Sequence, residues 1–156
     1  MMKVHIASLA SLGLEVDEPR SRYRGARRST SAVDTNPGLE DIAAVRVPYS
    51  AIETLAARLG VSTESLIAII GMTPRTAARR KLEASLKPDE SDRLFRVVRV
   101  FDEARRVLGS GDKAAAWLRA PHPMFWQHAP LRLLDSDAGA KAVTDELTRI
   151  DFGDFA

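Results

Sequence analysis

Residues 71–101 constrain the fold of this chain more than any other stretch, because they contain start and stop signals for two consecutive helices. Thr73 is a good N-cap residue, and Pro74 suits the first position of a helix. Pro88 breaks this helix and opens another, with two acidic residues in its first turn, where the helix dipole favours negative charge. The stretch therefore predicts a short basic helix followed by a long amphipathic helix.

A helix-turn-helix is predicted around the start of this stretch. Ser50 and Glu53 match a capping box, and Gly60 ends the helix that follows. Ser62 caps the next helix, which Gly71 closes before the basic helix begins. Two helices joined by a tight glycine-containing turn have the spacing of a DNA-binding motif. The residues expected in its core are Ile52, Leu55, Ala56, Leu59, Leu66, Ile67, Ile69 and Ile70.

The basic helix, which we expect to run from Pro74 to about Ser85, has two faces. The residues expected to face the core are Met72, Ala77, Ala78 and Leu82. The residues predicted to contact DNA are Arg75, Thr76, Arg79 and Arg80. The first turns of a recognition helix reach base edges, where Arg suits guanine and Thr suits a methyl contact or a hydrogen bond. The alternative is an ordinary solvated helix face.

The chain beyond the basic helix is also predicted to be largely helical. The long helix ends at Gly109, and its apolar stripe suits either the core or a dimer seam; the stripe consists of Leu94, Val97, Val98, Phe101, Ala104 and Leu108. A short helix over 112–119, a Pro-rich and aromatic-rich loop over 121–130 and a helical turn over 131–134 follow. Ser136 then caps a last helix, whose apolar face consists of Ala140, Val143, Leu147 and Ile150. Asp145 and Glu146 are expected on its solvated face.

Charge is segregated along the chain, although the net charge is only +2. Residues 58–87 contain six basic and two acidic residues, whereas residues 132–156 contain three basic and six acidic residues. This asymmetry indicates different partners for the two ends. Five arginines between residues 20 and 28 suit either a solvated tail or a flexible arm that contacts phosphates.

Composition and motifs disfavour several classes of protein. The chain has no cysteine, which excludes disulfides, thiolate catalysis and Cys-based zinc sites, so we expect a cytoplasmic protein. No apolar run is long enough for a membrane span. His122 and His128 have no acidic neighbour at ligand spacing, and no phosphate loop, nucleophile elbow or carboxylate pair stands out. We therefore expect a binding protein without a metal or cofactor, and not an enzyme.

Five ordered strings in the second half of the chain resemble the MbcA/ParS/Xre antitoxin family, the partners of RES-domain toxins. The strings are residues 71–80, 86–95, 109–121 and 129–135, and a last one made of 138–140, 143–150 and Gly153. Residues 45–70 fit the less distinctive N-terminal half of the family. Two departures are Lys87, where a capping Ser or Thr would serve better, and a loop over 122–128 that is bulkier than usual.

The resemblance implies an all-α protein in which an Xre-like helix-turn-helix is joined by a long helix to a small domain that dimerises and binds a toxin. The expected parts are a flexible basic arm and linker over 1–38, the DNA-binding domain over 39–87 and the toxin-binding domain over 88–156. The family implies an antitoxin of a type II system that blocks the active site of an NAD-degrading RES toxin with its C-terminal segment. It also implies that this antitoxin binds operator DNA and represses its own operon.

The toxin-binding residues that the resemblance implies are Asp151, Phe152, Gly153, Asp154, Phe155 and Ala156. A pocket that binds a dinucleotide pyrophosphate should be cationic, so an acidic and aromatic segment suits it. The expected partners are a RES-domain toxin, operator DNA and a second copy of the chain. The alternative function is a stand-alone helix-turn-helix repressor with a C-terminal dimerisation domain.

Overall fold

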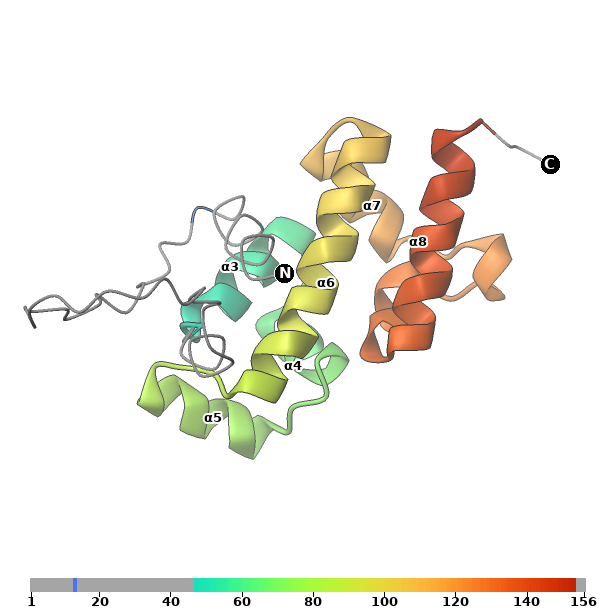
Figure 1. The fold of residues 1–156 in the computed structure, drawn as a ribbon. Coiled ribbons are helices and arrows are strands. Elements are labelled where there is room, and N and C mark those ends of the chain that lie inside the picture. Colours follow the sequence, from blue (N-terminus) through green and yellow to red (C-terminus); the bar gives the residue numbers. More distant parts are fainter. Residues whose placement is uncertain (1–12, 14–46, 154–156) are drawn as a thin grey trace, which may run out of the picture.

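The computed structural model of the chain describes residue 13 and residues 47–153. These residues form α-helices and two short 3-10 helices, and apart from two isolated bridges they contain no β-structure (Figure 1). The all-α architecture predicted from the sequence is therefore confirmed. The arginine-rich segment over 20–28 and the last three residues, 154–156, lie outside the described residues.

The first three described helices form the helix-turn-helix region: α3 (Ser50–Leu59), α4 (Thr63–Ile69) and α5 (Pro74–Glu83). Gly60 ends α3 in the left-handed conformation, with φ of 64°. The Ser62 hydroxyl accepts the Ser65 N–H at 3.1 Å, and the Thr73 hydroxyl accepts the Thr76 N–H at 3.2 Å. The stop signal of α3 and the start signals of α4 and α5 are thus confirmed.

The capping box predicted at Ser50 is wrong, because Ser50 is already the first helical residue of α3. The residue before it, Tyr49, has helical φ and ψ, and its side chain makes no capping hydrogen bond. Glu53 instead accepts a hydrogen bond from the Lys81 ammonium of α5 at 2.9 Å. A long-range ion pair has therefore replaced a local cap.

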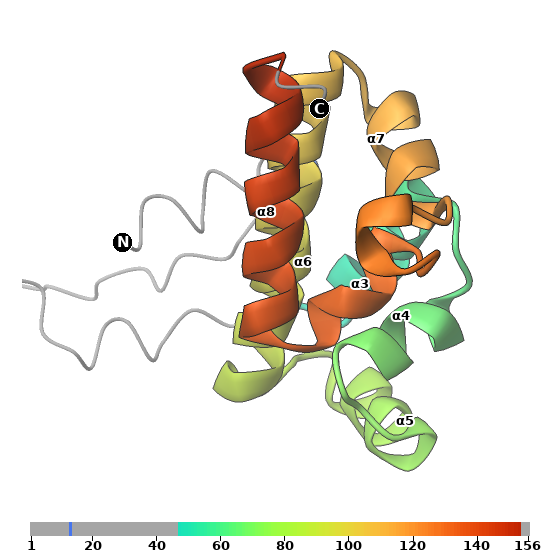
Figure 2. The ribbon, with the colours of Figure 1, turned by 90° about the vertical axis from the view of Figure 1, so that its right-hand side faces the viewer.

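The long helix α6 (Pro88–Leu108) connects the two halves of the molecule. Beyond it come α7 (Gly111–Arg119), η1 (Pro123–Phe125), η2 (Pro130–Asp135) and α8 (Asp137–Asp151). Figure 2 shows α8 beside α6. The Arg96 guanidinium lies 2.7 Å from Asp137 at the start of α8, and that of Arg106 lies 2.7 Å from Asp151 at its end. The two helices therefore run in the same direction.

A continuous hydrophobic core spans both halves of the described structure. Most of the apolar stripe of α6 is buried in it, including Leu94, Val97, Val98, Phe101 and Ala104. Leu108, at the end of the stripe, is only half-buried. The stripe therefore serves as core within one chain. No helix among the described residues is long and apolar enough to cross a membrane.

A glycine in the first turn of α8 packs closely against the backbone of η2. A Cβ atom added at Gly139 would lie 1.9 Å from the carbonyl oxygen of Leu133, far inside van der Waals contact. The Gly139 N–H also donates to the Ser136 hydroxyl, which caps α8 as expected. The close approach requires glycine here and fixes how α8 leaves η2.

Apart from the prediction for Arg80, which is treated with the functional site, three predictions about which side chains face the core are wrong. On α5, Leu82 is 89% exposed and Ala78 is also exposed, whereas Met72 and Ala77 are buried. The inner face of α5 is therefore rotated from the expected one. On α8, Glu146 was expected in solvent but is buried, with one carboxylate oxygen 3.1 Å from Nε of Arg149.

Candidate functional site

The outer face of α5, which we define as Arg75, Thr76, Ala78, Arg79 and Leu82, lines a shallow hollow of about 310 Å³. Arg75 makes no ion pair with any residue between 47 and 153. Arg79 lies 4.0 Å from Glu83, and both side chains are about half exposed. An exposed pair at that distance contributes little, so the guanidinium is available to an external anion.

Thr76 lies at the edge of this face and is half-buried. Its hydroxyl is 3.0 Å from that of Thr73, which also accepts the Thr76 backbone N–H. These contacts fix the first turn of α5. The structure thus brings three of the four predicted DNA-contacting residues, Arg75, Thr76 and Arg79, onto one exposed surface.

The fourth, Arg80, does not lie there, which corrects the sequence-based placement. Its side chain is only 3% exposed, and its Nε lies 2.9 and 2.7 Å from the two carboxylate oxygens of Glu90 on α6. Its Nη1 also contacts the Glu83 carboxylate. Because Arg80 follows Ala77 by three residues, it shares the inner face of α5 and points away from the outer face.

Both members of this buried pair remain charged at neutral pH. Burial raises the pKa of Glu90, but hydrogen bonds from Arg80 and from the Lys87 N–H outweigh burial and lower it overall. The hydrogen bond to Glu90 is the main reason that the pKa of Arg80 is raised. Glu90 accepts the Lys87 N–H at 2.8 Å, so it also caps the start of α6.

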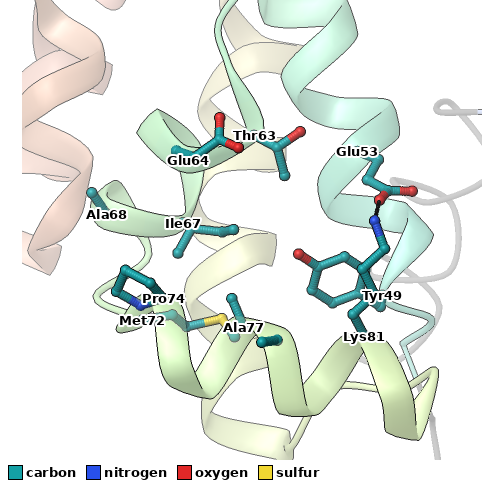
Figure 3. A pocket seen from close by; sticks show the side chains of 11 residues that line it. Tyr49, Glu53, Thr63, Glu64, Ile67, Ala68, Met72, Pro74, Ala77 and Lys81 are labelled. Atoms are coloured by element: carbon teal, nitrogen blue, oxygen red, sulfur yellow. Dashed lines mark hydrogen bonds and ion pairs between the residues drawn. The ribbon is translucent and has the colours of Figure 1, made fainter.

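A second hollow of about 390 Å³ lies between α3, α4 and α5 (Figure 3). Its walls are largely apolar, with Ile67 and Met72 among the lining residues. On one side the ammonium of Lys81 binds Glu53 and lies 5.8 Å from the centre of the Tyr49 ring. Sequence reasoning missed this hollow, because its lining residues come from three separate segments. It contains no catalytic constellation.

The end of α8 presents an exposed aromatic side chain. Phe152 is 82% exposed, and Gly153 follows it in the left-handed conformation. The Asp151 carboxylate is bound by Arg106, whose Nη2 also lies 2.8 Å from Glu103. Hydrogen bonds to these two carboxylates raise the pKa of Arg106. Of the predicted toxin-binding residues, Asp154, Phe155 and Ala156 lie outside the described residues.

The loop over 122–128 is closed by its own backbone. The His122 N–H donates to the His128 carbonyl at 3.2 Å, and the Gln127 N–H donates to the His122 carbonyl at 3.1 Å. Trp126 and Gln127 both have positive φ, 50° and 64°, which is strained for side-chain-bearing residues. The loop buries Phe125 and leaves Trp126 84% exposed. Neither histidine belongs to a potential metal-binding cluster among the described residues.

Comparisons with known proteins agree with this architecture. The family described as "Antitoxin Xre-like helix-turn-helix domain" matches residues 39–99, and "Antitoxin Xre/MbcA/ParS C-terminal toxin-binding domain" matches residues 103–153. The protein "Antitoxin Xre" of Yersinia enterocolitica serotype O:8 is 30% identical over 108 residues, which are 67% of this chain and 72% of that protein. The chain belongs to the Xre family of antitoxins.

Two further proteins match over more than two thirds of the chain. "Antitoxin Xre" of Photorhabdus laumondii is 29% identical over 121 residues, 76% of this chain and 82% of that protein. A chain in the crystal structure of the M. tuberculosis MbcT–MbcA toxin–antitoxin complex has a TM-score of 0.52 and 24% identity, covering 69% of this chain and 96% of its own. The latter similarity supports the fold alone. The two family matches meet between residues 99 and 103, within α6.

Proposed function

We propose that this chain is the antitoxin of a type II toxin–antitoxin system, that it neutralises a RES-domain, NAD-degrading toxin, and that it binds operator DNA to repress its own operon. The observation that carries the proposal is the contrast between two exposed surfaces. The helix-turn-helix domain exposes cations on α5, whereas the toxin-binding domain exposes aromatic side chains.

The exposed apolar side chains support a protein partner for the C-terminal half. Among the described residues, the large hydrophobic side chains classed as exposed are Leu82, Met124, Trp126 and Phe152. Three of these four lie in the matched toxin-binding domain. Aromatic residues and Met are enriched in the centres of protein interfaces, where buried aromatic anchors contribute much of the binding energy.

In the proposed complex the C-terminal segment, residues 151–156, enters the active site of the toxin. Arg106 fixes Asp151 and thereby the start of this segment, and Phe152 is the first exposed side chain beyond α8. A pocket for the pyrophosphate of NAD attracts negative charge, which favours an acidic segment. The net charge of −3 over residues 132–156 agrees with this role.

In the proposed complex with operator DNA, the contacts come from the outer face of α5, through Arg75, Thr76 and Arg79. Arg is suited to bidentate hydrogen bonding with guanine, and cations on the same face neutralise phosphates. In a homodimer two copies of α5 would contact two half-sites. Arg80 is left out of this set because its guanidinium is bound inside the molecule.

The test is co-expression with the RES-domain protein that we expect in the neighbouring reading frame. The chain should co-purify with that protein, restore growth and keep cellular NAD at the level of cells without toxin. The isolated chain, incubated with NAD, should consume none. A toxin that does not associate with the chain would overturn the proposal, and operator binding without association would identify a stand-alone repressor.

A further inference from the structure

We infer that Arg80 and Glu90 form a positioning pair, which sets the orientation of α5 against α6 so that Arg75 and Arg79 meet the DNA, and that Arg80 itself does not contact DNA. This inference rests on the proposed DNA-binding function of α5 and names residues that control it. It differs from a role for Arg80 in base or phosphate recognition, which its position in the basic helix suggests.

The geometry couples two helices through one carboxylate. One oxygen of Glu90 accepts from Arg80 of α5, and the other accepts from both Arg80 and the Lys87 N–H. Glu90 therefore caps the N-terminus of α6 and binds α5 at the same time. A change in the position of the first turn of α6 is transmitted to α5 through hydrogen bonds of 2.7–2.9 Å.

The chemistry of the pair also favours a positioning role. Burying two charges removes them from water, and an apolar pair of similar volume is often as stable. A guanidinium bound to a carboxylate, however, has directional hydrogen bonds that define an orientation as well as a distance. The connection from α5 to α6 is short, since α5 ends at Glu83 and α6 begins at Pro88. An oriented contact next to this connection fixes the angle between the two helices.

The substitution Glu90→Gln distinguishes a positioning role of Arg80 from a DNA contact, because the two roles predict opposite changes in operator affinity. It removes a negative charge near the DNA-binding surface and weakens the hold on Arg80, which keeps the Glu83 carboxylate and the new amide oxygen as weaker partners. If Arg80 contacted DNA, operator affinity would therefore rise. If the pair positions α5, operator affinity falls by about tenfold, a size typical of changes in a packed network. Affinity for unrelated DNA stays equal or rises, because it depends on cations and not on helix orientation.

The experiment measures the affinity of the full chain for its own upstream DNA and for unrelated DNA at several salt concentrations, by fluorescence anisotropy. Glu90→Gln should lose operator preference with an unchanged dependence on salt, whereas loss of a phosphate contact would lower the salt slope by about one. Equal or tighter operator binding by Glu90→Gln would overturn the inference. Circular dichroism checks that the variant is folded.

A second variant keeps the inference testable if Glu90→Gln does not fold. In Arg80→Met/Glu90→Leu an apolar pair fills the same place without an unpaired buried charge. Operator preference should again fall with an unchanged dependence on salt, because an apolar pair has no directional hydrogen bonds to orient α5. A salt slope lower by about one would identify Arg80 as a DNA contact, and wild-type operator affinity in the folded double variant would overturn the positioning role. If the wild type shows no operator preference, the proposed DNA-binding function fails. If Arg79→Ala weakens binding and Glu90→Gln does not, only the positioning role fails.

Discussion

The two halves of the molecule expose different chemistry around a shared helix. The outer face of α5 offers Arg75 and Arg79, while the C-terminal half offers Trp126 and Phe152. Cations dominate the affinity for nucleic acid, whereas aromatic anchors dominate the affinity for proteins. Because α6 runs through both halves, one chain can present a DNA-binding surface and a protein-binding surface that share few residues.

The two halves also differ in which helices supply the partners of their buried carboxylates. Glu90 is bound by Arg80 from another helix, so this pair connects α5 with α6. Glu146 is bound by Arg149 from the same helix, with His122 Nε2 3.8 Å away. An ion pair between helices can control their relative orientation, but a pair within one helix cannot. Among the ion pairs between described helices, the one with both side chains buried is thus a feature of the helix-turn-helix half.

The largest expected effect comes from removing the proposed toxin-binding segment while the outer face of α5 stays intact. Deleting residues 151–156 should abolish neutralisation of the toxin, because the segment proposed to fill its active site is gone. DNA affinity should not change, since α5 lies in the other half. Growth and NAD content measure neutralisation, and a gel shift measures DNA binding. Lys141→Ala, an exposed change on α8, is the control, and full protection by the truncated chain would exclude the blocking role.

The next largest effect concerns the close packing of Gly139 against η2. Gly139→Ala should lower the free energy of unfolding by about 3 kcal/mol, because its Cβ meets the Leu133 carbonyl at 1.9 Å. Gly111→Ala is the matched control, since its Cβ would lie in ordinary van der Waals contact, 3.8 Å from a ring atom of Phe101. Chemical denaturation compares the two variants. Equal stability would show that this contact tolerates a side chain.

Breaking the DNA-binding surface alone should have a smaller effect. Arg79→Ala should weaken operator binding by about 1–3 kcal/mol if the guanidinium contacts a base. Association with the toxin should not change. Arg99→Ala, which removes an exposed cation from α6, serves as the control for net charge in a gel shift. Unchanged affinity in Arg79→Ala would mean that the outer face of α5 is only solvated.

A substitution in the loop over 122–128 tests whether this loop contacts the toxin. Trp126→Ala should weaken binding to the toxin by more than about 1 kcal/mol, as expected for an aromatic anchor. Stability should change little, because the side chain is 84% exposed in the free chain. Isothermal titration measures the affinity, with Lys113→Ala on α7 as the control. Wild-type affinity in Trp126→Ala would remove this loop from the interface.

The smallest expected effect is a change in the stability contribution of Glu90 when the pH falls into the acid range. Because the pKa of Glu90 is lower in the folded chain than its ordinary value of 4.5, its stabilising contribution is complete above that value. The contribution is lost as the pH falls through the lower folded pKa. The stability difference between wild type and Glu90→Gln should therefore shrink below about pH 4.5. Thermal unfolding at pH 7 and pH 3 measures it, and a constant difference would contradict the assignment.

Local signals predicted the helices well, and tertiary contacts account for most of the errors. Gly60, Ser62 and Thr73 act through backbone groups only a few residues away, so their roles follow from the sequence. The burial of Arg80 could not be predicted in this way, because it depends on how α5 is rotated against α6.

In the candidate site, too, local features could be predicted from the sequence and tertiary contacts could not. The sequence identifies the cations of α5 but does not indicate which of them is bound by a carboxylate from another helix. Glu53 illustrates this at the other end of α5, where Lys81 binds it in place of the predicted cap. The positive φ of Trp126 likewise depends on the closed backbone of its loop and has no glycine to signal it.

The central claim is that DNA and toxin bind to separate surfaces, and one paired measurement tests it most directly. Arg75→Ala/Arg79→Ala and the deletion of residues 151–156 are each assayed for operator affinity and for toxin neutralisation. The account predicts that the first variant loses only DNA binding and that the second loses only neutralisation. A folded variant that loses both activities, or two variants that lose neither, would contradict it.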